Sequence, residues 1–141
     1  MTRHLLAIDD VEDDFEMILK WAVEFKRLWK EGDDVAVNFM PLDTLAVGSI
    51  YEKPSTRTRV SFEVGINRLG GYPLTLLKND IQLGKSETVG DTSQVLSRFL
   101  GAMTYRCFSH DDVTELAKYA DVPVLNALSD KHHPCQAAAD L

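Results

Sequence analysis

The sequence contains few cysteines, no long hydrophobic run and a shortage of basic residues. Its two cysteines, Cys107 and Cys135, form no Cys-x-x-Cys pair and indicate no disulfide framework. No apolar run approaches the length needed to cross a membrane, and no signal-peptide pattern opens the sequence. We therefore expect a cytoplasmic protein without a membrane-spanning segment.

The charge balance narrows the range of partners. Lysine and arginine together number 15, against 22 aspartate and glutamate residues, so the formal net charge is −7. A chain with this charge is poorly suited to bind nucleic acids or anionic membranes. The hydrophobic fraction of 45% and the length of 141 residues are typical of one globular domain with a real core. We expect residues 1–141 to form a single domain.

One stretch, residues 51–59, gathers hydroxyl and basic side chains against this acidic background. The apolar run at 45–50 before it predicts a buried strand, and the spacing of apolar residues at 60–69 predicts an amphipathic helix. Three hydroxyls and one guanidinium would therefore lie at a helix N-terminus: Ser55, Thr56, Thr58 and Arg57. Free backbone N–H groups and the helix dipole attract anions there, so the pattern favours a phosphate site. The alternative is an ordinary capped helix whose basic first turn is solvated.

The rest of the sequence alternates between strand and helix patterns. A first helix at 11–30 is followed by a polar connector at 33–43. Strands are expected at 45–50, 73–77, 102–107 and 122–128, and helices from 55, at 91–100, from 109 and from 134. This alternation predicts an α/β fold, a four-stranded parallel sheet with helices on both faces.

Polar residues follow the expected strands, where ligands of parallel sheets bind. Besides the Ser55–Thr58 turn, they are Asp80, Gln82, Gly84 and Lys85 after the second strand, Arg106 at the end of the third, and His132, His133 and Gln136 after the fourth. We expect these four segments to assemble one polar pocket. The histidine pair lacks a third ligand at a useful spacing, so we predict no metal site.

These motifs resemble those of the carbamoyltransferase family. Residues 55–59, Ser-Thr-Arg-Thr-Arg, are similar to its carbamoyl-phosphate signature, and residues 133–136, His-Pro-Cys-Gln, to its second motif. The loop at 79–85 is similar to the ornithine branch, as is Cys135, where the aspartate branch usually has threonine. The resemblance runs from Leu5 onward and covers only the family's N-terminal half, the carbamoyl-phosphate-binding domain. The amino-acid-binding domain is absent from the sequence.

The resemblance implies transfer of the carbamoyl group from carbamoyl phosphate to the side-chain amine of ornithine, a step of arginine biosynthesis that gives citrulline and phosphate and needs no cofactor. Three residues, Arg106, His133 and Thr58, would be catalytic by stabilising charge on the carbonyl oxygen. The substrate-binding set would comprise Ser55, Thr56, Arg57, Thr58, Gln82, Arg106, His133, Pro134, Cys135 and Gln136.

The same resemblance implies a homotrimer, in which Gln82 and Lys85 would reach the site of a neighbouring subunit. Because no residue of this half is placed to hold an amino acid, we expect the chain to bind carbamoyl phosphate without turning it over. We interpret Cys107 and Cys135 as small buried fillers. Arg59, beyond the tip of the signature, is as well suited to a structural role as to ligand binding.

Two departures from the family pattern bear on backbone geometry. Asp43-Thr44-Leu45 stands where Lys-Gly-Lys is more usual, and Ala127 stands where glycine is common. Both positions lie at or before strand ends, so they question the local conformation rather than the chemistry.

Other interpretations remain open at this point. Within the family they are an aspartate or polyamine-type carbamoyltransferase, or a bare carbamoyl-phosphate-binding domain. From a different class, residues 5–10, Leu-Leu-Ala-Ile-Asp-Asp, are similar to the first strand and acidic pair of a receiver-type signalling domain. That function needs a phosphoacceptor aspartate at the end of a central strand, and no expected strand ends in one.

Overall fold

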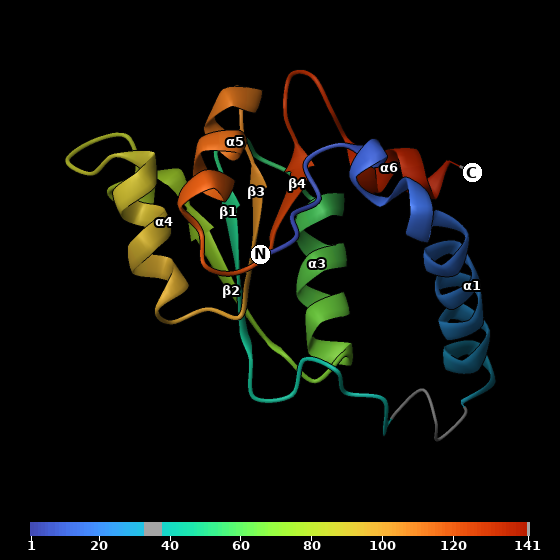
Figure 1. Cartoon of the computed structure of the whole chain (residues 1–141). Helices are drawn as coiled ribbons and strands as arrows, with labels where there is room; N and C mark the ends of the chain where they lie inside the picture. Colours follow the sequence, from blue (N-terminus) through green and yellow to red (C-terminus); the bar gives the residue numbers. More distant parts are fainter. Residues whose placement is uncertain (33–37, 141) are drawn as a thin grey trace.

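The structure is a computed structural model that describes residues 1–32 and 38–140. Its elements are η1 (Ile8–Asp14), α1 (Phe15–Glu31), β1 (Ala46–Tyr51), α3 (Arg57–Arg68), β2 (Tyr72–Leu77), η2 (Lys78–Asp80), α4 (Val89–Ser97), β3 (Ala102–Arg106), α5 (His110–Tyr119), β4 (Val124–Leu128) and α6 (Pro134–Ala139) (Figure 1). Of the connector expected at 33–43, residues 33–37 lie outside the described residues. Within the described ranges, no helix is both long and apolar enough to cross a membrane.

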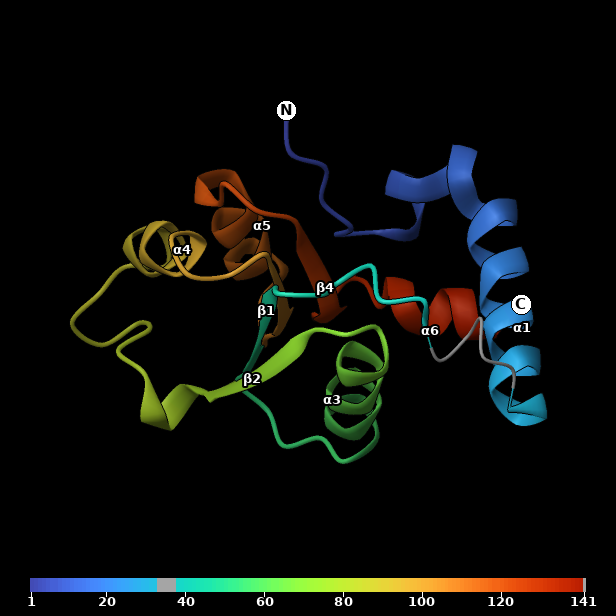
Figure 2. The same ribbon diagram turned by 90° about the horizontal axis from the view of Figure 1, so that it is seen from below.

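The four strands form one sheet in the order β2-β1-β3-β4, and every pairing is parallel. Helix α3 covers one face of the sheet, and α4 and α5 cover the other (Figure 2). Helix α6 packs against β4 and η1. The predicted four-stranded parallel sheet with helices on both faces is therefore confirmed.

The strand order places a topological switch point between β1 and β3. The chain leaves β1, adds β2 on one side, and then returns to add β3 on the other side of β1. The connections that leave these two neighbouring strands diverge to opposite faces, which opens a crevice outside their carboxyl ends. The Ser55–Thr58 turn follows β1 and Arg106 ends β3, so both border this crevice.

The core lies between the sheet and the α4–α5 layer. It contains Ile50 of β1, Met103 and Tyr105 of β3, and Val113 and Leu116 of α5, all fully buried. Strand residues two apart share a face, so these positions form one apolar side of the sheet. The apolar runs recognised in the sequence are the strands that supply this core.

The first helix differs from the expectation of a single element at 11–30. It opens as the 3-10 helix η1, with a non-helical Val11 (φ −125°, ψ 21°), and becomes α-helical only at Phe15. The Asp10 carboxylate accepts hydrogen bonds from the backbone N–H groups of Leu6 and Ala7, at 2.7 and 2.9 Å. An aspartate that bonds nearby backbone in this way competes with regular helix geometry. Gly32, with φ 69°, ends α1 as expected.

Residues 5–10 do not form the first strand of a receiver domain. Leu5 makes only an isolated parallel bridge with Leu125, and Asp9 and Asp10 lie exposed within η1. The expected helix at 91–100 is α4, which begins earlier, at Val89, and ends earlier, at Ser97. Its start is earlier because the Thr88 hydroxyl caps it by accepting a hydrogen bond from the Asp91 N–H at 3.0 Å.

Candidate functional site

The expected strand-to-helix turn is present between β1, which ends at Tyr51, and α3, which begins at Arg57. Thr56 is the N-cap residue of α3, with helical backbone angles (φ −83°, ψ −55°). Thr58 and Ser55 are half-buried, whereas Thr56 and Arg57 are exposed. The positive end of the α3 dipole, three hydroxyls and a guanidinium therefore meet at one place, as the sequence predicts.

An open cleft of about 550 Å³ lies beside this turn. It is lined by Ser55, Thr56, Arg57, Thr58, Arg106, Leu128, His133 and Gln136. Seven of these residues were expected to share a pocket, and they come from three segments of the sequence. The cleft lies where the switch point between β1 and β3 opens the sheet edge.

Arg106 is the last residue of β3 and crosses to the turn. Its Nη1 donates a hydrogen bond to the Thr58 hydroxyl at 3.2 Å. Its Nε atom is buried and has no hydrogen-bond partner within residues 1–32 and 38–140. A buried guanidinium donor without a protein partner is costly, so Arg106 is suited to hold an anionic or carbonyl oxygen in the cleft.

The backbone opposite Arg106 is irregular. Tyr105 pairs with Asn126, but Arg106 pairs with Leu128, so Ala127 is the extra residue of a bulge in β4. Leu128, which lines the cleft, has φ 145°, a value that residues with a side chain rarely adopt. The bulge thus lies at the position where the family commonly has glycine. Thr44, where glycine is also usual, has φ 66°.

His133 faces the cleft from the start of α6. It is the N-cap of this helix, and its Nδ1 accepts a hydrogen bond from the Gln136 N–H at 3.4 Å. Burial, together with the nearby charge of Arg106, lowers the pKa of His133 below its ordinary value. A neutral imidazole that accepts at Nδ1 carries its proton on Nε2, which can then donate to a ligand.

Gln136 also enters the cleft from α6. Its Nε2 donates to the Asp140 carboxylate at 2.8 Å, which leaves the amide oxygen as the acceptor for a ligand. Pro134, between the two motif residues, is buried in the first turn of α6. Cys135 is half-buried, with Sγ 3.9 Å from the Asn126 carbonyl oxygen, and burial raises its pKa.

Both cysteines have the character of buried fillers. Cys107 Sγ lies 3.0 Å from the Ser109 carbonyl oxygen, and burial raises its pKa to about 12. A thiol that stays protonated is a poor nucleophile. The structure thus supports a packing role for Cys107 and Cys135 rather than a covalent one.

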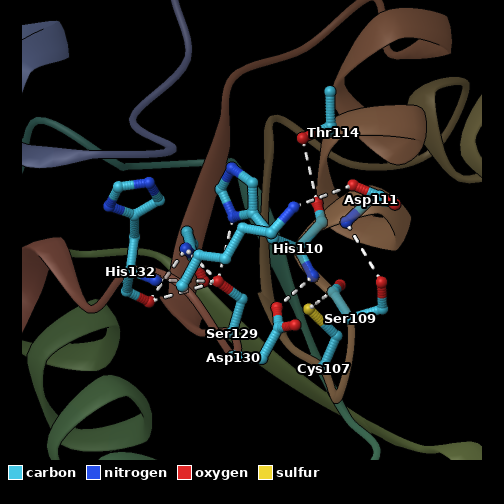
Figure 3. A network of polar contacts seen from close by, with 10 residues as sticks. Cys107, Ser109, His110, Asp111, Thr114, Ser129, Asp130 and His132 are labelled. Atoms are coloured by element: carbon cyan, nitrogen blue, oxygen red, sulfur yellow. Dashed lines mark hydrogen bonds and ion pairs between the residues drawn. The ribbon is translucent and has the colours of Figure 1, made fainter.

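The turn that carries His133 is held by a network of polar contacts (Figure 3). The Asn126 side-chain amide donates to Ser129 Oγ at 3.2 Å and to the His132 carbonyl at 3.1 Å. His110 Nδ1 lies 2.9 Å from Ser129 Oγ, and the His110 N–H donates to the Asp130 carboxylate at 2.7 Å. His132 packs edge-on against His110 with ring centroids 4.8 Å apart, and it is not among the residues lining the cleft. The network anchors the segment before His133.

Gln82 and Lys85, also expected near the pocket, lie elsewhere. Both are exposed on the loop between β2 and α4, and neither lines the cleft. Lys85 Nζ donates to the Asn79 carbonyl at 3.2 Å, and Gln82 Oε1 accepts from the Ser86 hydroxyl at 3.1 Å. The loop follows β2, the edge strand farthest from β4, and lies on the opposite side of the molecule from α6 (Figure 1). Within one chain the expectation of a four-segment pocket is therefore wrong.

Sequence reasoning missed Glu52, Lys78 and Tyr105. The Glu52 side chain is only 2% exposed, and it binds both other residues. In the sequence, Glu52 has the pattern of an ordinary charged turn residue. Only its position directly after an apolar strand could have indicated that it is buried. Among the described residues, no group of three or more His, Cys, Asp or Glu side chains is arranged to hold a metal ion.

Comparison with known proteins places this geometry in a family. Residues 3–141 match the family model described as "Aspartate/ornithine carbamoyltransferase, carbamoyl-P binding domain". Ornithine carbamoyltransferase of Methanopyrus kandleri is 47% identical over an alignment of 141 positions, which covers 99% of this chain and 44% of the relative. The enzyme of the same name from Acidothermus cellulolyticus is 49% identical over 143 residues, covering 100% of this chain and 44% of that relative.

Solved structures of similar fold belong to proteins of the same name. Ornithine carbamoyltransferase from Pyrococcus furiosus superposes with a TM-score of 0.91 at 47% identity, covering 98% of this chain and 43% of that one. A mitochondrial ornithine carbamoyltransferase from Coccidioides immitis superposes with a TM-score of 0.92 at 38% identity, covering 99% of this chain and 44% of that one. The chain thus spans less than half the length of these relatives. It belongs to the aspartate/ornithine carbamoyltransferase family and matches that family's carbamoyl-phosphate-binding domain.

Proposed function

We propose that this chain binds carbamoyl phosphate in the cleft and serves as the carbamoyl-phosphate-binding half of an ornithine carbamoyltransferase. One observation carries the proposal. A helix N-terminus rich in hydroxyls shares a single cleft with Arg106, His133 and Gln136, which come from two other segments. The names of the relatives support ornithine as the acceptor of the carbamoyl group.

The phosphate group would sit at the Ser55–Thr58 turn. There the first N–H groups of α3, the hydroxyls and the Arg57 guanidinium offer many donors to its oxygens. Arg57 is exposed, so it can close on a ligand without being displaced from a buried position. Because the whole chain is acidic, this local concentration of donors is needed to attract a dianion.

The carbamoyl group would point toward Arg106, His133 and Gln136. The amine attacks the carbonyl carbon, negative charge develops on the carbonyl oxygen, and the bond to the phosphate oxygen then breaks as the proton lost by the amine passes to the leaving phosphate. Arg106, the Thr58 hydroxyl and His133 Nε2 are the donors for the developing charge. Removal of one such donor typically costs about 2.7–4 kcal/mol of transition-state stabilisation. The Gln136 amide oxygen, left open by the bond from its Nε2 to Asp140, would accept from the carbamoyl NH2 group.

The proposal extends to the rest of the enzyme. The amino acid would be held by the half that the relatives have and this chain does not span. Holding the amine at attack distance can supply roughly 7–11 kcal/mol, so binding without turnover is expected of this chain alone. The exposed loop with Gln82 and Lys85, outside its own cleft, supports the proposal of a homotrimer in which another copy receives it. We also propose a cytoplasmic role in arginine biosynthesis.

The test is titration of the chain with carbamoyl phosphate and with inorganic phosphate while the amide NMR signals of residues 55–59 are followed. We expect these signals to shift and saturate, and Arg106→Ala to weaken binding. Arg98→Ala is the matched control, because it removes the same charge from an exposed site at the end of α4. Signals at 55–59 that stay fixed at millimolar ligand would overturn the assignment. Citrulline formed from added ornithine above the uncatalysed rate would show that this half carries more of the active site than proposed.

A further inference from the structure

Glu52 is a buried carboxylate beside the candidate site that the proposed reaction does not use. It follows β1 directly and precedes the Ser55–Thr58 turn, and its side chain is only 2% exposed. Its Oε1 accepts from Lys78 Nζ at 2.8 Å and from the Tyr105 hydroxyl at 2.9 Å, and its Oε2 accepts from the Phe108 N–H at 2.8 Å. Such a fully bonded buried carboxylate is costly to disturb.

The donors come from the ends of the two strands that flank β1 on either side. Lys78 follows β2, whereas Tyr105 and Phe108 flank the end of β3 on either side of Arg106. In addition, the Glu52 N–H donates to the Arg106 carbonyl at 2.9 Å. Glu52 therefore binds Tyr105, just before Arg106, Phe108, two residues after it, and the Arg106 backbone. The start of the turn and the end of β3 that carries Arg106 are joined through this one residue, by its side chain and its backbone.

The charge and position of Glu52 suit it to hold the turn against the end of β3. Burial alone would raise its pKa, but the hydrogen bonds from Lys78, Phe108 and Tyr105 outweigh burial and lower it, so the carboxylate stays ionised near neutral pH. It does not line the cleft. It borders a neighbouring hollow of about 360 Å³, which shares Ser55 and Thr56 with the cleft.

We propose that Glu52 is a positioning residue for Arg106. By holding Tyr105 and Phe108, it sets the guanidinium at the distance from the Ser55–Thr58 turn where it binds Thr58 and can also reach the carbonyl oxygen of bound carbamoyl phosphate. The proposal rests on the proposed function for the identity of the ligand. It adds that Glu52 acts through Arg106 on the carbamoyl end, whereas the phosphate end depends on the turn itself.

The experiment compares two ligands in the 141-residue chain. Inorganic phosphate probes the turn alone, and carbamoyl phosphate probes the turn and Arg106 together. Glu52→Gln should weaken the binding of carbamoyl phosphate about tenfold or more, which is the loss expected for a disturbed hydrogen bond to a charged group. It should weaken the binding of inorganic phosphate much less. Arg106→Ala should reduce the preference for carbamoyl phosphate in the same way. A general loosening of the fold would weaken both ligands equally, which would overturn the proposal.

The matched control is Glu63→Gln. Glu63 lies on α3 and accepts from the Thr75 hydroxyl and from Arg59 Nε, the latter at 3.0 Å, so the same chemical change removes a comparable set of bonds. Neither of these partners belongs to β3, so the preference between the two ligands should not change. If Glu52→Gln does not fold, Tyr105→Phe removes a single hydroxyl donor and should lower the preference in the same direction, by a smaller factor.

The results separate the two proposals. If the unmodified chain binds neither ligand, the proposed function fails. The positioning of Arg106 by Glu52 is then tested by the NMR signal of the Arg106 Nε–H group. This signal should move in Glu52→Gln and stay in place in Glu63→Gln. If the unmodified chain binds carbamoyl phosphate and Glu52→Gln keeps both affinities, the proposed function stands and the positioning role is overturned.

Discussion

The two faces of the sheet differ in chemistry although the same strands supply both. On the face toward α4 and α5, Ile50, Met103 and Tyr105 are fully buried in an apolar core. On the face toward α3 (Figure 2), the alternate positions of β1 and β3 include Ser49 and Thr104, which are polar and also buried, together with the apolar Val47 and Tyr51. The apolar face supplies most of the folding free energy, whereas the polar face leads directly to the cleft.

Some buried polar groups on the polar face lack hydrogen-bond partners among the described residues. Within the described parts of the chain, neither the Thr104 hydroxyl nor Arg106 Nε has a hydrogen-bond partner, and both atoms are buried. A buried polar group left without a partner costs about 1–3 kcal/mol. Strand residues of this face therefore reduce stability while their neighbours at the strand ends form the site. Stability and binding are thus separated by the alternation of side chains along β1 and β3.

The largest effect is expected from damage to the apolar face. Leu116 of α5 is fully buried in the core, so Leu116→Ala should lower the free energy of unfolding by about 2–5 kcal/mol through lost burial and a residual cavity. Denaturant unfolding followed by circular dichroism measures this change. The phosphate affinity of the folded protein should stay the same. A large change in affinity under conditions where the variant is fully folded would show that the two faces are not independent.

A smaller effect of opposite sign is expected on the polar face. Thr104→Val replaces the unpartnered buried hydroxyl by a methyl group of similar shape, so it should raise the free energy of unfolding by about 1 kcal/mol. The measurement is the same denaturant titration. Thr114→Val is a useful control, because its hydroxyl is exposed and donates to the His110 carbonyl at 2.9 Å. Destabilisation by Thr104→Val would mean that this hydroxyl has a partner in solution, such as a buried water.

The smallest effect concerns pH at the site. Burial and the charge of Arg106 lower the pKa of His133 from 6.5, so the unfolded chain binds its proton more readily than the folded one. The neutral imidazole therefore contributes stability above pH 6.5, and this contribution is lost as the pH falls through the folded pKa. His133→Asn keeps an N-cap acceptor but removes the titration, so stability should fall less steeply between about pH 7 and 5.

The pH comparison also has an internal reference. His4 and His110 have pKa values lowered mainly by burial, so they should give the variant a remaining slope of the same sign. Leu116→Ala should shift the whole curve downward with its slope unchanged, since it removes no titrating group. Equal slopes for the unmodified chain and His133→Asn would mean that His133 titrates alike in the folded and unfolded states.

Much of the fold could be predicted from local pattern. The apolar runs predicted all four strands, and the Ser109 cap predicted the start of α5, where its hydroxyl accepts from the Asp111 N–H at 3.2 Å. Helix limits were less accurate, because they depend on side chains such as Asp10 and Thr88 that bond backbone groups in ways the apolar period does not reveal.

The candidate site was predicted in part. Ser55, Thr58, Arg106, His133 and Gln136 do line one cleft. Gln82 and Lys85 do not, because strand order, which the sequence pattern leaves open, places β2 at the far edge of the sheet. These residues of the cleft were found because each ends a strand or lies in the segment that follows one, and the carboxyl ends of parallel strands share an edge.

By itself, the sequence determined which segments become strands and helices, and it placed hydroxyls and Arg57 at the start of α3, because these depend on residues near one another in the chain. Only the tertiary structure decided that β3 returns beside β1, that a bulge at Ala127 offsets Arg106 against Leu128, and that Glu52 is buried between strand ends. These features arise from contacts between residues far apart in the sequence. Their energies depend on which strands become neighbours, and no local pattern carries that information.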